Sequence, residues 1–159
     1  MENKRDESAA GDKLAETEQR RAAPAPADRI ELEPGTLSRR ELKVILDSLP
    51  VDISFVDAND RVRYFNQPEG RIFTRAKAVI GRAVQQCHPP KSIHLVNRIL
   101  DEFKSGQRDL AEFWINLRGK LVYIRYLPLR SDDGEYIGCL EVTQDVTRIR
   151  ELEGEKRLL

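Results

Sequence analysis

The last third of the chain contains three long segments with the composition of β-strands, and two tight turns join them. The segments span residues 109–117, 121–129 and 136–146, and Gly119 and Gly134 lie in the turns between them. Turns this short join neighbouring antiparallel strands, so the segments predict an antiparallel meander. Apolar residues fill both alternating sets of positions in the first two segments, which predicts a sheet that is covered on both faces.

A short helix and a hairpin are predicted before this meander. Apolar residues recur at the spacing of one helix face before Pro50, which predicts an amphipathic helix over residues 37–49. Strand-like runs at 51–56 and 61–65 flank the turn sequence Asp57-Ala58-Asn59-Asp60 and predict a hairpin. The chain is therefore expected to enter its sheet through a helix and two paired strands.

Residues 66–106 lack strand alternation and predict a helical segment. Short pieces are expected at 71–77 and 78–81, and a longer helix is expected to begin at Pro89-Pro90 and to end at Gly106. One apolar stripe on the longer helix is formed by Ile93, Val96, Ile99, Leu100 and Phe103. This stripe is the face with which the helix should cover the sheet.

The two ends of the chain differ in composition from the middle. Residues 1–36 have almost no large apolar side chains and contain an Ala-Pro-Ala-Pro run, which predicts a disordered tail. Residues 37–147 form the expected globular domain. Residues 148–159 predict a charged C-terminal helix with Thr147 as its N-cap, although Gly154 weakens it.

The composition excludes several classes of partner, location and activity. Lysine and arginine number 27 and aspartate and glutamate number 27, so the net charge is zero and no nucleic-acid footprint is expected. No apolar run approaches the roughly 18 residues of a membrane span, and no signal peptide is recognisable. We therefore expect a soluble cytoplasmic protein in which both cysteines are free thiols. No kinase, cyclase or nucleotide-loop motif is present, so no enzymatic activity is expected.

Both histidines and one of the two cysteines lie within residues 87–94, which lead into the longer helix. Histidine and cysteine bind transition metals and change protonation near neutral pH, so this segment is the first candidate for chemistry. Cys87 is a candidate redox-sensing thiol, because a helix N-terminus favours the reactive thiolate. A structural zinc site would need Cys139 or a carboxylate to complete it. A role as helix entry and recognition surface is the alternative.

Several local motifs resemble those of PAS domains and occur in the same order. Val62-Arg63-Tyr64-Phe65-Asn66 resembles the second strand of the family, Val79-Ile80-Gly81-Arg82 a turn in its helical segment, and Asp145-Val146-Thr147 its terminal motif. A closer resemblance is to the PAS domain at the C-terminal end of bacterial hemerythrin-like proteins of unassigned function, carried by residues 49–53, 87–92, 112–115 and 140–159.

This resemblance implies an α+β PAS fold, with a five-stranded antiparallel sheet, helices over one face and a small pocket between them. It also implies a sensory module that detects a small ligand, a haem-bound gas or a redox state. The signal would pass through Asp145 and Thr147 to the exit helix or to a dimer interface. The residues expected to line the pocket are Phe55, His94, Phe113, Ile115, Ile124 and Tyr126.

His94 is the residue on which the cofactor hypothesis rests. Haem-binding PAS domains take their proximal histidine from the long helix, and His94 has a comparable position, so haem is the candidate cofactor and His94 the candidate iron ligand. A partly buried polar residue at the edge of that helix is the alternative interpretation. A flavin photosensor is not expected, because its reactive cysteine should follow Gly81-Arg82 by two residues, where Ala83 and Val84 follow instead.

The competing hypothesis is a ligand-free PAS adaptor. Such a module would pair with a second copy or dock a partner through its sheet, Trp114 and the terminal helices, since a large exposed apolar patch usually marks an interface. A homodimer and a downstream signalling protein are the expected partners. The fold alone does not decide between a ligand-binding module and a ligand-free one.

Overall fold

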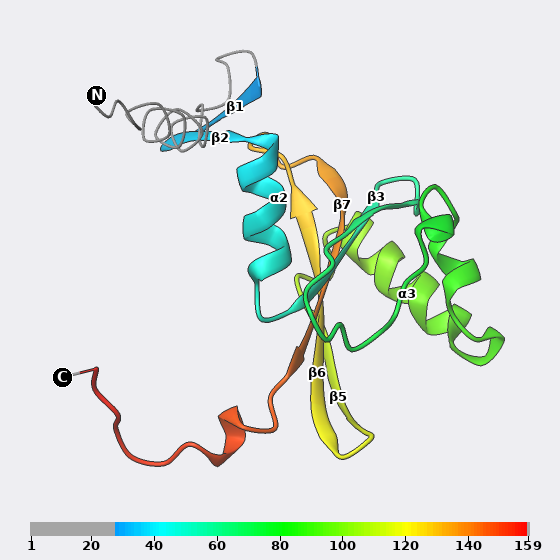
Figure 1. The fold of residues 1–159 in the computed structure, drawn as a ribbon. Coiled ribbons are helices and arrows are strands. Elements are labelled where there is room, and N and C mark those ends of the chain that lie inside the picture. Colours follow the sequence, from blue (N-terminus) through cyan, green and yellow to red (C-terminus); the bar gives the residue numbers. More distant parts are fainter. Residues whose placement is uncertain (1–27, 159) are drawn as a thin grey trace, which may run out of the picture. The chain divides into compact units, whose positions relative to one another are not determined.

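The computed structural model describes residues 28–158 (Figure 1), and residues 1–27 and 159 lie outside the described part. The described residues divide into two compact units, residues 28–42 and residues 43–158. Most of the disordered tail predicted for residues 1–36 therefore lies outside the described residues.

The described residues of the first unit contain a two-stranded hairpin. β1 (Arg29–Leu32) pairs antiparallel with β2 (Gly35–Ser38). Arg29 ties the strands together, because its Nε donates to Thr36 Oγ1 at 2.8 Å and its Nη2 donates to the Thr36 carbonyl at 2.9 Å. The prediction of a disordered tail is therefore wrong for residues 29–36. Cross-strand hydrogen bonds from a charged guanidinium stabilise this hairpin, and a low content of apolar residues does not reveal them.

A capping box starts α2 (Arg39–Ser48). The Ser38 hydroxyl accepts a hydrogen bond from the Glu41 N–H at 3.1 Å, and the Glu41 carboxylate accepts one from the Ser38 N–H at 2.7 Å. These bonds give partners to backbone groups at the start of the helix, and they hold the pKa of Glu41 below its usual value. The helix begins two residues later than the sequence pattern predicts and ends before Pro50, which cannot continue it.

A five-stranded antiparallel sheet with the strand order β4-β3-β7-β6-β5 forms the centre of the second unit. The strands are β3 (Asp52–Asp57), β4 (Val62–Phe65), β5 (Ala111–Leu117), β6 (Lys120–Arg130) and β7 (Tyr136–Asp145). The predicted hairpin and meander are both present, and the α+β fold with this sheet is confirmed. Because β3 pairs with β7, residues distant in sequence become neighbours at the centre of the sheet.

α3 (Ile93–Lys104) crosses one face of the sheet (Figure 1). Phe103 has 0 % of its surface exposed and Leu100 is also buried, while Val96 and Ile99 pack beside them. These four residues of the predicted stripe thus face the sheet. The buried part of the apolar core consists of Val56, Val62, Val84, Leu100, Phe103, Ala111 and Cys139.

Three 3₁₀ turns precede α3, in place of the short helical pieces expected between 71 and 81. They are η2 (Lys77–Val79), η3 (Val84–Cys87) and η4 (Pro90–Ser92). Residues 66–76 contain no helix, so the piece predicted at 71–77 is wrong over most of its length. This irregular stretch becomes important at the candidate site, because its backbone needs hydrogen-bond partners from elsewhere.

The two edges of the sheet differ. The β4 edge is covered at its first residue by residues 81–84, since the Val62 N–H donates to the Arg82 carbonyl at 3.0 Å and the Val62 carbonyl accepts from the Gly81 N–H at 2.7 Å. β5 forms the opposite edge, and no strand of the described residues pairs with its outer side. Trp114 in this strand has 65 % of its surface exposed.

The residues after β7 depart from the sequence prediction. η5 (Ile149–Glu151) is a single 3₁₀ turn, and residues 152–158 contain no helix, so the C-terminal helix predicted for 148–159 is not formed over its described part. Isolated helices shorter than about 12–15 residues are marginal in water, and Gly154 adopts a left-handed φ of 63°. Among residues 28–158, no helix combines the length and the apolar character that crossing a membrane requires.

Candidate ligand site at the polar half of the sheet face

The sheet face that carries the apolar core also carries a group of polar residues. Val56 pairs with Cys139 in the core, and residues two positions along a strand share its face. The next two pairs on this face are polar, and they consist of Ser54 with Glu141 and of Asp52 with Thr143. We call these four residues the polar half of the sheet face.

Residues 66–75 cover the polar half through hydrogen bonds. Asp52 Oδ2 accepts from the backbone N–H groups of Ile72 and Phe73 at 2.9 and 3.2 Å. The guanidinium of Arg75 pairs with the carboxylate of Glu141 at 2.6 Å, and both side chains are mostly buried. A helix satisfies its own backbone, whereas an irregular segment needs partners from the surface beneath it. Polar residues on the sheet supply those partners.

Arg71 fastens the irregular segment to the sheet. Its Nε donates to the Phe73 carbonyl at 2.9 Å, and its Nη1 donates to the Asn66 carbonyl at 2.7 Å. Its Nη2 donates to Ser54 Oγ at 3.2 Å, and its Nε lies 3.9 Å from Asp52 Oδ2. The guanidinium thus fixes the path of the irregular segment and places a positive charge next to Oδ2 of Asp52.

The side chain of Asn66 joins three backbone segments. Its Nδ2 donates to the carbonyls of Leu46 and Val51, both at 2.9 Å, and its Oδ1 accepts from the Ile53 N–H at 2.6 Å. Asn66 has 0 % of its surface exposed. A buried amide with its donors and acceptor paired gives these segments one defined arrangement.

A hollow of about 140 Å³ opens beside the polar half. Asp52 and Thr143 line it together with Lys120 and Asp145, and the remaining lining residues are Leu49, Pro50, Val51, Pro68, Glu69, Gly70 and Ile72. Thr143 has 1 % of its surface exposed, and its hydroxyl oxygen has no hydrogen-bond partner among the described residues. Buried hydroxyl groups normally have partners, because an unpaired one costs free energy. The hollow is therefore lined by a residue with an unused hydrogen-bonding group.

Asp145 connects this hollow to the end of the chain. Its Oδ1 accepts from the Thr147 N–H at 3.0 Å and from the Thr147 hydroxyl at 2.6 Å, and its Oδ2 lies 3.0 Å from Lys120 Nζ. The Thr147 hydroxyl accepts in turn from the Leu121 N–H at 2.8 Å. The hydrogen bonds from Thr147, followed by the contact with Lys120, lower the pKa of Asp145 to about 2. The two residues assigned to signalling from the sequence thus contact each other.

The family model for PAS domains matches residues 42–147. The chain belongs to the PAS domain family. PAS domains are in general sensory and signalling modules, so the sensory class expected from the sequence is confirmed at this level. No curated protein matches this PAS domain.

Solved structures resemble this PAS domain to different degrees. A C-terminal domain from Streptococcus mutans has 33% sequence identity and a TM-score of 0.74, and the match covers 79% of this chain and 97% of that one. The PAS domain from Bordetella pertussis BvgS has 21% identity and a TM-score of 0.51, with 69% and 87% covered. A PAS domain from Colwellia psychrerythraea has 15% identity and a TM-score of 0.50, with 69% and 97% covered. The last two likenesses concern the fold alone.

Four of the six residues expected to line a pocket share the sheet face of the core, namely Phe113, Ile115, Ile124 and Tyr126. The rings of Phe113 and Tyr126 stack with their centroids 6.0 Å apart, and burial raises the pKa of Tyr126. Phe55 pairs with Leu140, one position out of step with the Ser54–Glu141 pair, so its side chain lies on the other face of the sheet. The structure therefore separates Phe55 from the other four.

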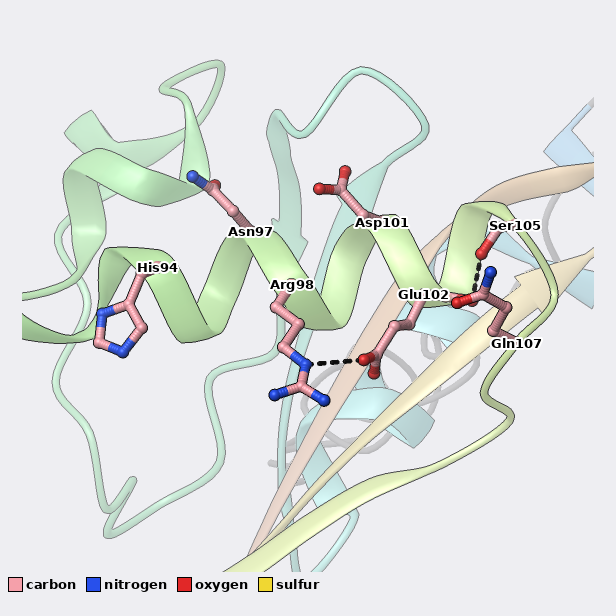
Figure 2. A pocket seen from close by; sticks show the side chains of 7 residues that line it. All are labelled: His94, Asn97, Arg98, Asp101, Glu102, Ser105 and Gln107. Atoms are coloured by element: carbon pink, nitrogen blue, oxygen red, sulfur yellow. Dashed lines mark hydrogen bonds and ion pairs between the residues drawn. The ribbon is translucent and has the colours of Figure 1, made fainter.

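His94 is exposed, so the structure does not place it in the interior as the sequence argument assumed. Figure 2 shows its imidazole on the same side of α3 as Arg98 and Glu102, whereas the sheet side of the helix carries Leu100 and Phe103. The shallow surface there is lined by His94, Asn97, Arg98, Asp101, Glu102, Ser105 and Gln107. The apolar macrocycle of haem requires apolar burial, and these polar residues do not fit it.

Cys87 ends the 3₁₀ turn η3, and the next turn begins at Pro90. This position differs from the helix N-terminus on which the redox hypothesis rested. The Cys87 thiol is half-buried against the core, with Sγ 4.0 Å from the Ala83 carbonyl. Cys139 is buried in the core, and burial raises its pKa to about 12. Among the described residues, no three His, Cys, Asp or Glu side chains are grouped to hold a metal ion.

The polar half was not predicted from the sequence, although it leaves a signal there. Asp52 and Ser54 occupy alternate positions of β3, and Glu141 and Thr143 occupy alternate positions of β7. Polar residues at a period of two in a central strand are a usable signal, because buried polar groups require partners. The partner Arg71 left no such signal, since its segment has no periodicity.

Proposed function

We propose that this PAS domain is a sensory module that binds a small ligand in the hollow beside Asp52 and Thr143 and relays its occupancy through Asp145 and Thr147. The observation that supports the proposal is that Asp145 belongs both to the hollow and to the end of the sheet. This residue lines the hollow and also accepts two hydrogen bonds from Thr147. A ligand that changes the partners of Asp145 changes how the chain leaves the sheet.

Lys120 supplies the exchangeable contact in this relay. Its ammonium lies 3.0 Å from Asp145, and more than half of its side chain is exposed. Exposed ion pairs contribute little free energy, so a ligand can replace one partner at low cost. In one state Asp145 contacts both Lys120 and Thr147, and in the other a ligand in the hollow displaces one of these two residues from Asp145. The ligand shifts this equilibrium only by the difference in its affinity for the two states.

The relay is tested with Asp145→Ala in the full chain. Loss of the carboxylate removes the acceptor of Thr147, so the amide resonances of Leu121 and Thr147 should move and residues 148–158 should become more mobile in ¹⁵N relaxation. The matched control is Asp133→Ala, which removes an exposed carboxylate from the turn between β6 and β7. Unchanged relaxation of residues 148–158 in Asp145→Ala would contradict the relay.

A ligand-free adaptor that pairs with a second copy is the second candidate, and the exposure of Trp114 favours it. Trp114 lies on the sheet face opposite Phe113, and an indole with 65 % of its surface exposed gains free energy when a partner covers it. Light scattering should then give a mass near twice that of one chain, and Trp114→Ser should return it to one. A monomeric wild-type protein at high concentration contradicts this candidate.

The place of the module in larger proteins is a further part of the proposal. The likeness to a domain described as C-terminal in Streptococcus mutans supports a C-terminal position for this module. An association with hemerythrin-like proteins stays a prediction from the sequence. A downstream signalling protein that contacts residues 148–158 would receive the output. The coupling between the hollow and residues 148–158 would be measurable as a change in the affinity for this partner when a ligand occupies the hollow.

A further inference from the structure

We propose that the hollow beside Asp52 and Thr143 binds the ammonium group of a small primary amine. The inference rests on the sensory function proposed above and specifies the chemistry of its ligand. Three properties of the lining support this inference. They are hydrogen-bond acceptors without partners, an excess of negative charge, and a small volume with apolar walls.

The two buried polar residues of the lining offer hydrogen-bond acceptors. Asp52 uses Oδ2 for the amides of Ile72 and Phe73, and no donor to its Oδ1 is present among residues 28–158. Thr143 lies directly opposite Asp52 in the register, and its hydroxyl oxygen is unpaired among the same residues. Side chains in this relation have Cβ atoms about 5 Å apart, so a ligand that bonds to Asp52 lies next to the buried hydroxyl of Thr143. A primary ammonium carries three N–H donors and can bond to the carboxylate and the hydroxyl together.

The charge of the lining favours a cation over an anion. Asp52, Glu69 and Asp145 bring three carboxylates to the hollow, and Lys120 brings one ammonium that already pairs with Asp145. Arg71 lies behind Asp52, but its N–H groups donate to carbonyl, amide and hydroxyl oxygens. Its charge offsets that of Asp52 without using the free carboxylate oxygen. An anion would meet two more negative groups than positive ones in the lining itself.

The volume suits a short amine. The hollow of about 140 Å³ exceeds the roughly 30 Å³ that one water occupies in the liquid, so it has room for a ligand of a few non-hydrogen atoms. Its apolar walls come from Leu49, Pro50, Val51, Pro68 and Ile72. These walls suit the alkyl part of a small amine, and the described lining contains no group of three side chains that could hold a metal ion.

The test is an NMR titration of the ¹⁵N-labelled full chain, in which ethylammonium chloride replaces sodium chloride at constant ionic strength. Ethylammonium should shift the amides of Ile72, Phe73 and Thr143 saturably, with a dissociation constant no tighter than roughly millimolar for so small a ligand. Tetramethylammonium has the charge without N–H donors, and acetate has the opposite charge. Neither should produce saturable shifts at these three amides.

Two variants and one control assign the binding to the hollow. Thr143→Val keeps the shape and removes the hydroxyl, and Asp52→Asn removes the charge while keeping an acceptor for the Ile72 and Phe73 amides. Each should weaken ethylammonium binding about tenfold, as expected for one hydrogen bond involving a charged group. Thr74→Val, at an exposed threonine outside the lining, should leave the dissociation constant unchanged. Thr143→Val keeps the test valid if Asp52→Asn does not fold, because the hydroxyl has no partner in the fold.

The outcomes separate this inference from the relay. Absence of saturable ethylammonium binding, equal binding of tetramethylammonium, or unchanged affinity in Thr143→Val overturns the amine site. If ethylammonium binds as expected but the resonances of residues 147–158 do not respond, the amine site stands and the relay falls. If acetate instead binds and moves residues 147–158, the relay stands and the amine site falls.

Discussion

The apolar core and the polar half occupy the same sheet face but are covered by different kinds of structure. Over the core lies α3, whose backbone hydrogen bonds are internal, so the strands beneath it can present Val56, Val62 and Cys139. Over the polar half lies the irregular segment 66–75, and the strands beneath it present carboxylates and hydroxyls. The backbone of the cover thus decides which residues the sheet must carry.

This difference also predicts how each region responds to mutation. The core is stabilised by filled volume, so truncation and added polarity should both destabilise it. The polar half is stabilised by paired hydrogen bonds, so loss of a paired group should destabilise it and loss of an unpaired group should not. Four predictions test this contrast.

The largest effect is expected for Phe103→Ala in the core. Phe103 has 0 % exposure, so its removal leaves a cavity beneath α3, and the free energy of unfolding should fall by about 3–5 kcal/mol in urea denaturation. Phe113→Ala, on the sheet face that carries the core, is the matched control, and its partial exposure should make the loss clearly smaller. Equal losses for the two variants would show that α3 does not close the core.

The next largest effect is expected for Asn66→Ala. The substitution leaves the Ile53 N–H and the carbonyls of Leu46 and Val51 without their partner, which should lower the free energy of unfolding by about 2–3 kcal/mol. Asn116→Ala removes an exposed amide from β5 and should stay within about 0.5 kcal/mol of wild type. A loss no greater than that of the control would mean that the segment covering the polar half does not depend on the hydrogen bonds of Asn66.

A pair of swaps between valine and threonine compares the two regions directly. Val62→Thr places a hydroxyl in the apolar core and should cost about 1–3 kcal/mol. Thr143→Val removes an unpaired buried hydroxyl and should leave the free energy of unfolding unchanged or raise it by up to about 1 kcal/mol. Urea denaturation of both variants measures the sign of the change in the free energy of unfolding. Destabilisation by both substitutions would contradict the proposed contrast between the two regions.

The smallest effect concerns the protonation of Asp145. Its folded pKa of about 2 lies below the usual value of about 3.9 for aspartate, so its stabilising contribution is present above about pH 4 and disappears as pH falls through about 2. Thr147→Val removes the hydroxyl that donates to Asp145 and should move this pKa toward its usual value. The ¹³C shift of the carboxyl carbon reports the titration, and an identical pKa in wild type and variant would contradict the assigned cause.

Most of the fold could be predicted from the sequence because its elements have periodic patterns. Turn residues such as Gly119 and Gly134 bound the strands, and the stripe that ends at Phe103 marks the buried face of α3. The site could not be predicted in the same way, because its contacts join residues far apart in sequence. Arg75 and Glu141 are 66 residues apart, and no local pattern in either segment predicts that they pair.

Two of the candidate residues, Phe55 and His94, lie away from the predicted pocket. Phe55 follows Ser54, which lies on the face of the core, and so points to the other face of β3. His94 lies between Ile93 and Val96 in the sequence, but its direction from the helix axis places it outside the stripe that packs on the sheet. In strands and helices one residue decides the direction of a side chain, so an element can be predicted correctly while its functional face is not.

The unequal edges of the sheet limit how copies of this chain could associate through their backbones. Because Val62 at the start of β4 is already paired with residues 81–84, β5 is the edge whose outer side no described strand pairs with. Two chains that joined antiparallel along β5 would each use this edge, and the resulting ten-stranded sheet would end in a partly paired strand on both sides. Partial pairing of the outer strands disfavours further strand addition, so association along β5 favours a closed pair over an extended filament.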